Sequence, residues 1–163
     1  MKETGKKAWI IVWYLMITGL LIALDQWTKQ LAVAYLKGQE AIPIIKGVFE
    51  LSYLENPGMA WGLLSGKRIL FLIASVLILA LIVYVFYKAP LTRRYRPLRI
   101  ILAVLSAGAV GNFIDRFIQG YVVDFFSFCL IHFPIFNVAD CYVVVSGIAF
   151  VIFFLFYYKE EEL

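Results

Sequence analysis

Four long runs of apolar residues limit what this chain can fold into. They cover residues 8–24, 69–87, 100–114 and 138–158. The first run holds 17 residues without a charge, and a helix of that length would be about 26 Å long, close to the thickness of a bilayer core. The chain of 163 residues is 63% hydrophobic, with a mean hydropathy of +0.87, well above an ordinary soluble domain. The sequence therefore predicts an all-α polytopic membrane protein, with four transmembrane helices in a single domain spanning residues 1–163.

The basic residues predict how these helices are oriented, because positive charges concentrate on the cytoplasmic side of membrane proteins. They stand before the first run and between the second and third: Lys2, Lys6, Lys7, Lys88, Arg93, Arg94, Arg96 and Arg99. The segment 88–99 contains no acidic residue. We therefore expect the N- and C-termini and the loop at 88–99 to be cytoplasmic, and the loops at 37–67 and 115–137 to be extracytoplasmic.

A basic start followed by an apolar run also describes a secretory signal peptide, and Ala32-Val33-Ala34 imitates a cleavage site. We reject this alternative because the run is longer than the ~7–15 residues of a usual signal core. In addition, Asp25 and Lys29 precede the supposed site. The first run is therefore interpreted as a transmembrane helix, which residues 31–36 could continue.

The stretch at 37–67 is the first sizeable polar part of the chain and is rich in glycine and proline. Residues 44–45 and 48–54 lie between turn residues and predict short strands, so we expect a small extracytoplasmic sheet on the membrane surface. Within this stretch, Pro57 and Gly58 favour a tight turn that can present the Asn56 amide inward. Turn formation alone is the competing explanation for Asn56.

Polar residues gather at one level of the predicted bundle. The outer helix ends and loops hold Asp25, Asn56, Asn112, Asp115, Arg116, Asp124, Asn137 and Asp140. Ionised groups near hydrocarbon are costly, so a chain that is this apolar retains them only where they have a role. The one-sided cluster predicts a shared pocket at the outer leaflet.

Asp124 and Asp140 are the candidate catalytic residues. Asp124 stands between Val122-Val123 and Phe125-Phe126, and Asp140 lies in the first turn of the last predicted helix. A carboxylate that simply stabilises a helix start is the competing explanation for Asp140. Two aspartates in a dry pocket would share one proton, so that one activates water while the other donates a proton. That arrangement would hydrolyse an amide without a metal or a covalent intermediate.

The other charged candidates have structural explanations as well. Asp25 and Lys29 share one helix face, where they either pair at the interface or turn inward to support the site. Asp115 and Arg116 either brace the loop, or Arg116 holds a phosphate or a carbonyl oxygen through its several donors.

The two cysteines, Cys129 and Cys141, lack a metal-ligand spacing and are interpreted as packing residues, with a disulfide as the alternative. The only histidine, His132, is interpreted as an interface residue. A nucleophile pair of His132 with Cys141 is conceivable, and a Ser65–Lys67 dyad is weaker still. Neither pair has an orienting signature.

Two further functions stay open on these residues alone. A small transporter or channel would place its acids along a path across the membrane, whereas the acids predicted here lie at one end. A non-catalytic membrane scaffold would keep its function without either candidate aspartate. The chain lacks a basic, aromatic-interleaved face suited to nucleic acid, so that class is excluded.

Five motifs, in this order, resemble those of lipoprotein signal peptidase, the signal peptidase II family of bacterial membrane aspartyl proteases. They are Asp25-x-x-x-Lys29, Glu55-Asn56-Pro57-Gly58-x-Ala60, Gly111-Asn112-x-x-Asp115-Arg116, Val123-Asp124-Phe125 and Phe136-Asn137-x-Ala139-Asp140. The resemblance covers essentially the whole chain. Val110 stands where the family commonly has a glycine.

The resemblance implies a multi-pass hydrolase of the bacterial cytoplasmic (inner) membrane, with its active site on the extracytoplasmic side. Such enzymes cut signal peptides from prolipoproteins just before a cysteine that carries diacylglycerol, and they need no metal or cofactor. The family's catalytic dyad maps onto Asp124 and Asp140. Its supporting residues map onto Asp25, Lys29, Asn56, Asn112, Asp115, Arg116 and Asn137, and Gly58 belongs to the motif around Asn56.

The same resemblance implies partners. They are prolipoproteins with a lipid-modified cysteine, membrane lipids, and cyclic peptide antibiotics of the globomycin type, which block the dyad. Nothing in the sequence demands more than a monomer. Small residues fill the later turns of the third run, and small residues allow close helix contact in membranes. We expect this helix inside the bundle, with residues such as Gly108 leaving room for an incoming substrate helix.

Overall fold

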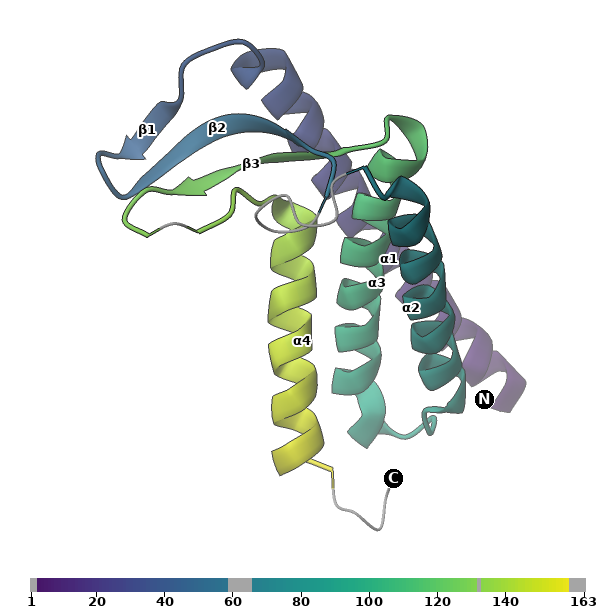
Figure 1. Ribbon diagram of the computed structural model, residues 1–163. Coiled ribbons are helices and arrows are strands. Elements are labelled where there is room, and N and C mark those ends of the chain that lie inside the picture. The colour runs from purple at the N-terminus through teal and green to yellow at the C-terminus, as the bar shows by residue number, and fades with distance from the viewer. Residues whose placement is uncertain (1–2, 59–65, 132, 159–163) are drawn as a thin grey trace.

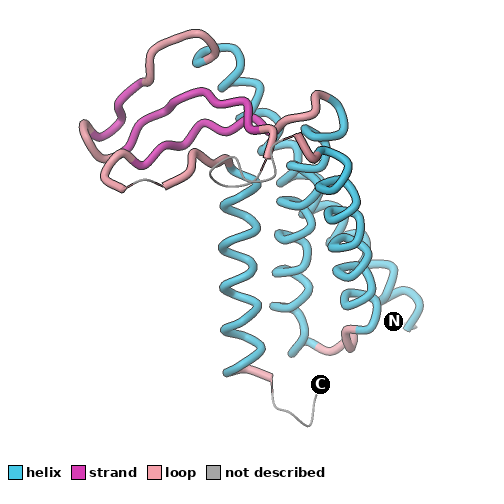
Figure 2. Tube along the Cα trace, viewed as in Figure 1, coloured by secondary structure: helices cyan, strands magenta, loops and turns pink. Residues whose placement is uncertain are grey.

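The computed structural model describes residues 3–58, 66–131 and 133–158. Four helices stand side by side and a small sheet covers one end of them (Figure 1). The elements are α1 (Glu3–Leu36), β1 (Ile42–Ile45), β2 (Phe49–Asn56), α2 (Arg68–Lys88), a short 3-10 helix (Arg93–Tyr95), α3 (Arg96–Ile118), β3 (Val122–Phe128) and α4 (Val138–Phe156). Figure 2 separates the helical bundle from the strands.

All four helices are long and apolar enough to cross a membrane, which confirms the predicted four-helix membrane architecture with a small sheet. Helices α1 and α3 are longer at both ends than the predicted runs, and their C-terminal extensions bear on the site. Helix α1 continues to Leu36, because the polar side chains of its second half are paired inside the protein rather than ending the helix. Helix α3 continues to Ile118, so Asp115 and Arg116 belong to its last turns and not to the loop predicted at 115–137.

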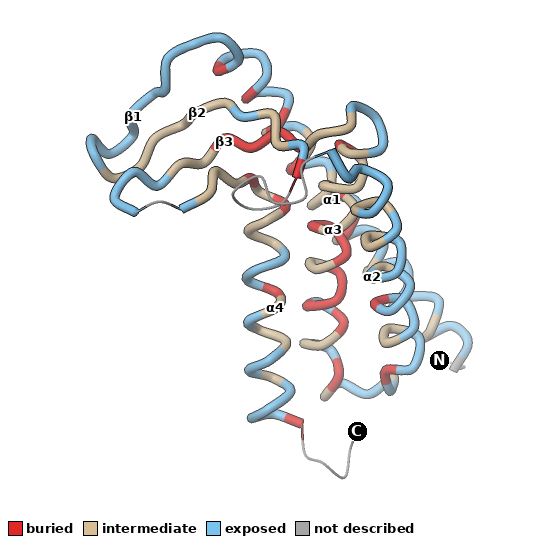
Figure 3. Tube along the Cα trace, viewed as in Figure 1, coloured by how far each residue is buried: buried red, intermediate tan, exposed pale blue. Residues whose placement is uncertain are grey.

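Helix α3 is the centre of the bundle and contacts α1, α2 and α4. Half of an apolar 18-residue stretch of α3 is buried inside the protein, compared with 11% of such a stretch in each of the other three helices. Figure 3 shows the difference along the helix. Its small residues make this possible: Ala103, Ser106, Ala107, Gly108 and Gly111 are all buried. The expectation that α3 lies inside the bundle is consistent with this packing.

The idea that Gly108 leaves room for a substrate helix is wrong. A Cβ atom placed on Gly108 would lie 2.6 Å from the Ala139 carbonyl oxygen and 2.8 Å from a Val143 methyl group. The space beside Gly108 is therefore already filled by the first turns of α4. The glycine serves to bring α4 against α3.

The sheet has three antiparallel strands in the order β1-β2-β3. β1 contains Pro43, which an edge strand accommodates because one side of it needs no partner. β2 and β3 pair over most of their length, with Leu54 opposite Asp124 and Asn56 opposite Val122. Strand β3 lies in what the sequence analysis treated as a loop. Its first four residues are all buried, so the alternating pattern of a half-exposed strand is missing.

An apolar cluster fixes the sheet on the helices. Ala32 and Leu36 from the end of α1 pack against Val123 and Phe125 of β3. Val123 and Phe125 flank Asp124 in the sequence, so the cluster also fixes the position of Asp124 relative to the end of α1. Both the start of α1 and the end of α4 lie at the opposite end from the sheet (Figure 1).

Replacing Gly108 with Leu is expected to destabilise the protein, because the side chain would have to displace the backbone of α4. Overpacking of this kind costs about 1–3 kcal/mol or more. Thermal unfolding in detergent measures the effect. Gly147→Leu is the matched control, since a Cβ atom at Gly147 of α4 meets nothing within 4 Å. Equal melting temperatures for the two variants would contradict the packing described here.

Candidate active site

The site begins with the cap of α4. Asn137 is the N-cap residue, and its side-chain oxygen accepts a hydrogen bond of 3.0 Å from the backbone N–H of Asp140. The Asp140 carboxylate in return accepts 3.1 Å from the backbone N–H of Asn137. This reciprocal capping box satisfies two of the free N–H groups at the helix start. It also fixes Asp140 at the positive end of the α4 dipole.

Asp124 reaches the same place from β3. Its side chain is almost fully buried and accepts hydrogen bonds from the Asn56 amide at 2.8 Å and from the Asn137 amide at 2.6 Å. Asn56 is the last residue of β2. The side-chain oxygen of Asn56 accepts a hydrogen bond of 3.0 Å from the backbone N–H of Gly58. This turn leaves the side-chain N–H₂ group facing Asp124.

Asn112 of α3 connects the two aspartates from a third side. Its side-chain N–H₂ group donates to Asp140 at 2.7 Å. Its side-chain oxygen accepts hydrogen bonds from the Asn137 amide at 3.2 Å and from Lys29 at 3.0 Å. Asn137 therefore contacts Asp124, Asp140 and Asn112 at once. The two carboxylates belong to one hydrogen-bonded frame.

A buried ion network lies behind this frame. The Lys29 ammonium is 2.9 Å from Asp25 and 3.0 Å from Asp115, and all three side chains are at most 5% exposed. Asp25 also accepts 2.9 Å from the backbone N–H of Ala139, and Asp115 accepts 3.2 Å from that of Val123. The network thus ties α1 and α3 to the residues beside Asp140 and Asp124.

Two carboxylates meet one ammonium here, and Gln26 supplies further donors. Its amide nitrogen lies 3.2 Å from Asp25, 3.0 Å from Asp115 and 3.2 Å from the Gly111 carbonyl oxygen. The sequence analysis did not select Gln26. The useful signal would have been chemical: two buried carboxylates require more donors than one lysine provides.

Gly111 has a role that depends on having no side chain. A Cβ atom there would lie 2.5 Å from a carboxylate oxygen of Asp25. Because that oxygen is held by Lys29 and Gln26, it cannot move away without breaking the network. The glycine therefore allows Asp25 to pass between α3 and α4.

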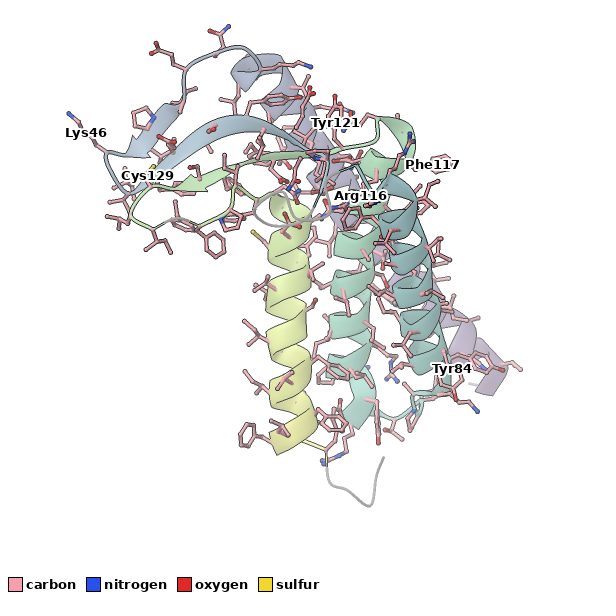
Figure 4. All side chains as sticks on the ribbon, viewed as in Figure 1. Lys46, Tyr84, Arg116, Phe117, Tyr121 and Cys129 are labelled. Atoms are coloured by element: carbon pink, nitrogen blue, oxygen red, sulfur yellow. The ribbon has the colours of Figure 1, made fainter. Side chains whose placement is uncertain are left out.

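Arg116 closes the group on the α2 side (Figure 4). Its guanidinium donates hydrogen bonds to the backbone carbonyl oxygens of Gly58 at 3.1 Å and Asn112 at 3.4 Å. It also lies 4.9 Å from the centre of the Phe71 ring. Its Nε–H is buried and has no hydrogen-bond partner among the described residues.

A cavity of about 510 Å³ opens onto these residues. Asn56, Asn112, Arg116, Asp124 and Asp140 form its polar part. The rest of the wall is mostly apolar: Val122, Phe128, Phe133, Pro134, Ile135, Phe136, Val144 and Val145. The last two lie further along α4 and are exposed on the outside of the bundle. The cavity therefore joins the buried Asp124 and the partly buried Asp140 to an apolar outer surface of the bundle.

The pKa of Asp124 is raised from its ordinary value of 3.8 to about 7, chiefly by burial and in part by the negative charge of Asp140. The hydrogen bonds from Asn56 and Asn137 act in the opposite direction. At neutral pH this carboxyl group is consequently close to half protonated. A group in that condition can both give and take a proton.

The structure brings together the residues that the sequence analysis selected. Asp124, Asp140, Asn56, Asn112 and Asn137 form the frame. Asp25, Lys29 and Asp115 form the network behind it, which agrees with the inward-turned Asp25–Lys29 pair, and Gly58 and Arg116 complete the turn. No group of three His, Cys, Asp or Glu residues in the described part of the chain could hold a metal ion.

The cysteines do not pair. Cys129 is exposed beyond the end of β3, whereas Cys141 lines the cavity, and both are free thiols, so the disulfide alternative is wrong. His132 and Ser65 lie outside the described residues. The suggested pairs with Cys141 and Lys67 are therefore not part of the site described here.

A family model described as signal peptidase (SPase) II matches residues 17–156. The chain belongs to the signal peptidase II family. Its relatives include proteins named lipoprotein signal peptidase from Brevibacillus brevis and Enterococcus faecalis. The first is 42% identical over 83% of this chain and 89% of its own length. The second is 40% identical over 90% of this chain and 89% of its own length.

Two solved structures are also similar to this signal peptidase II family member. One is described as a bacterial membrane enzyme determined by the in meso method at 2.3 Å resolution. It has a TM-score of 0.79 and 33% identity, over 94% of this chain and 95% of its own. The other, at 1.9 Å, has the same TM-score and 34% identity, over 91% and 96%. The family is one of proteases, and the matched residues include both aspartates and the whole network behind them.

Replacing Lys29 with Met is expected to cost about 3–5 kcal/mol of folding free energy, because Asp25 and Asp115 would be left buried without their cation. Unfolding titrated with a denaturing detergent measures this loss. Lys37→Met is the matched control, since Lys37 pairs with Glu55 on the exposed surface and such pairs contribute little. Equal stability of the two variants would show that the network does not support the fold.

Proposed function

We propose that this chain is a membrane aspartic endopeptidase that removes signal peptides from diacylglyceryl-modified bacterial prolipoproteins. It cleaves just before the lipidated cysteine. Membership of the signal peptidase II family supports the substrate class, as do relatives named lipoprotein signal peptidase. The single observation that carries the mechanism is the pair of carboxylates, Asp124 and Asp140, in one cavity and in one hydrogen-bonded frame.

Asp124 and Asp140 share one proton when substrate binds. The ionised carboxylate takes a proton from a water molecule, whose oxygen attacks the carbonyl carbon of the scissile amide. The protonated carboxyl group gives its proton to the carbonyl oxygen, and a gem-diol intermediate forms. The proton taken from water then passes to the leaving nitrogen as the C–N bond breaks. One hydroxyl of the diol returns its proton to the other carboxylate as the new carboxyl group forms. No covalent enzyme intermediate, metal or cofactor enters this sequence of steps.

The supporting residues position this chemistry. Asn56, Asn112 and Asn137 orient the carboxylate oxygens, while Asp25, Lys29 and Asp115 hold the strand and helix on which the two acids stand. Gly58 fixes the turn that carries Asn56. Arg116 lines the cavity and offers its guanidinium group to a carbonyl oxygen of the substrate backbone.

The enzyme spans the bacterial cytoplasmic membrane with its sheet end on the extracytoplasmic side. The basic residues of the described helix ends and of the 88–99 loop favour this orientation, with both termini cytoplasmic. The aspartates on the helices, Asp25, Asp115 and Asp140, all lie at the sheet end. A transporter would instead need acids along a path to the other side.

The two parts of the cavity suit the two parts of the substrate. The polar part receives the scissile peptide, and the apolar wall that extends to Val144 and Val145 receives acyl chains from the bilayer. Cyclic peptide antibiotics of the globomycin type bind in the same cavity and block the dyad. All proposed site residues come from one chain, so a monomer suffices.

Asp124→Asn and Asp140→Asn are each expected to lower turnover of a lipidated precursor peptide by at least ~10³-fold, because an amide can neither accept nor donate the required proton. Thermal unfolding should show folded protein, and binding of a globomycin-type inhibitor should remain detectable. Glu50→Gln is the control, since Glu50 lies on β2 outside the cavity lining. Precursor cleavage by either aspartate variant at the rate of the control would refute the dyad.

The rate kcat/KM is expected to fall as the pH rises through about 7, where Asp124 loses the shared proton. The hydrogen bond from Asn56 stabilises the ionised carboxylate, so Asn56→Ala should raise this pKa. The fall in rate should then occur roughly 0.5–1 pH unit higher. Ser127 lies on β3, as Asp124 does, but makes no hydrogen bond to it in the described part of the chain. Ser127→Ala should therefore leave the pH profile unchanged. A shift of the Asn56 variant to lower pH would contradict the assignment.

A further inference from the structure

A second cavity, of about 310 Å³, lies between the N-terminal halves of α1 and α3. It is at the opposite end of the bundle from the sheet, where α1 and α3 both begin (Figure 1). Its walls are Trp9, Ile10, Trp13, Tyr14 and Ile17 from α1, and Arg96, Arg99 and Ile100 from α3. We refer to these eight residues as the basal groove. None of them belongs to the active site.

The basal groove carries two positive charges that no described acid neutralises. The Arg99 side chain is buried, at 8% exposure, and its guanidinium donates to the carbonyl oxygens of Pro90 at 2.6 Å and Thr92 at 2.8 Å. Those bonds satisfy its donors but not its charge. The Arg96 side chain is exposed and makes no hydrogen bond or ion pair with another described residue. Two guanidinium groups lining one hollow favour an anionic ligand.

The remaining walls are mostly apolar, and three of their side chains, Trp9, Trp13 and Ile100, are exposed. Trp9 and Trp13 pack edge to face, with ring centres 5.7 Å apart, and each is about half exposed. Tryptophan in this position is typical of the level of the lipid headgroups. Ile100 is also exposed, on the α3 side. A ligand here would have an anionic head beside the arginines and hydrocarbon along the tryptophans.

The groove is held open by contacts deeper in the bundle. The Tyr14 hydroxyl is 2.5 Å from the Ser106 hydroxyl, and the Thr18 hydroxyl donates 3.3 Å to the Ala103 carbonyl oxygen. These two hydrogen bonds fix the spacing of α1 and α3 just beyond the hollow. The site therefore exists before a ligand arrives, which reduces the ordering cost of binding.

We propose that the basal groove binds the phosphate headgroup of one anionic phospholipid in the leaflet opposite the sheet. The phosphodiester lies against Arg96 and Arg99, and the first part of an acyl chain runs along Trp13 and Ile100. Basic hollows between transmembrane helices are suited to anionic headgroups. A free phosphate ion would leave the apolar walls uncovered, so the lipid is the occupant that matches both parts. This binding is independent of the proposed peptidase mechanism.

The test uses the purified full chain in detergent, with phosphatidylglycerol or phosphatidylcholine added at the same mole fraction. Thermal unfolding and native mass spectrometry measure stabilisation and retained lipid. Phosphatidylglycerol should raise the melting temperature and remain bound through purification, and phosphatidylcholine should do neither. Arg96→Gln should weaken retention of phosphatidylglycerol roughly fivefold, the effect expected for one basic residue near an anionic lipid surface.

Arg93→Gln is the matched control. Arg93 is an exposed arginine of the preceding 3-10 helix that does not line the groove. This variant therefore removes one positive charge three residues before Arg96. It should retain phosphatidylglycerol as the unaltered protein does. Equal weakening in both variants would show a general surface-charge effect and overturn the site. Equal stabilisation by millimolar inorganic phosphate would show that the ligand is a free anion rather than a lipid.

Discussion

The structure depends on a single buried ammonium group, that of Lys29. It is the common partner of Asp25, Asp115 and Asn112, which come from α1 and α3. The carboxylates of the two aspartates also accept hydrogen bonds from the backbone N–H groups of Ala139 and Val123, so the ammonium fixes the backbone there as well. Each of those backbone groups adjoins a candidate catalytic aspartate in the chain. A charge placed where water is scarce can thus orient two acids that it does not touch itself.

This arrangement separates two demands that conflict in a membrane enzyme. In the proposed mechanism, the acids must be dry enough for one of them to keep a proton near neutral pH, yet the substrate must reach them from lipid. The hydrogen-bonded frame around Asn137 meets the first demand, because it supplies fixed donors in place of water. The apolar wall of the cavity along α4 meets the second. The sheet above closes the site without lying between it and the bilayer.

Much of this was predictable from the sequence, because lipid imposes strong rules on composition. Charge-free runs predict spans, and a carboxylate amid apolar residues, such as Asp124, predicts a site. Strand β3 was missed because its residues are buried on both faces and show no alternation. Gln26 was missed because an amide beside an aspartate carries no signal of its own. The space beside Gly108 was misjudged, since sequence shows that a residue is small but not what fills the gap.

The central claim is that the two aspartates hold one proton between them at neutral pH. Infrared difference spectroscopy across a pH titration measures it directly, because a protonated carboxyl group has a carbonyl stretch distinct from that of a carboxylate. The account predicts such a band that persists at pH 6, disappears with a midpoint near pH 7, and is absent from Asp124→Asn. A spectrum with every carboxyl group already ionised at pH 6 would contradict it.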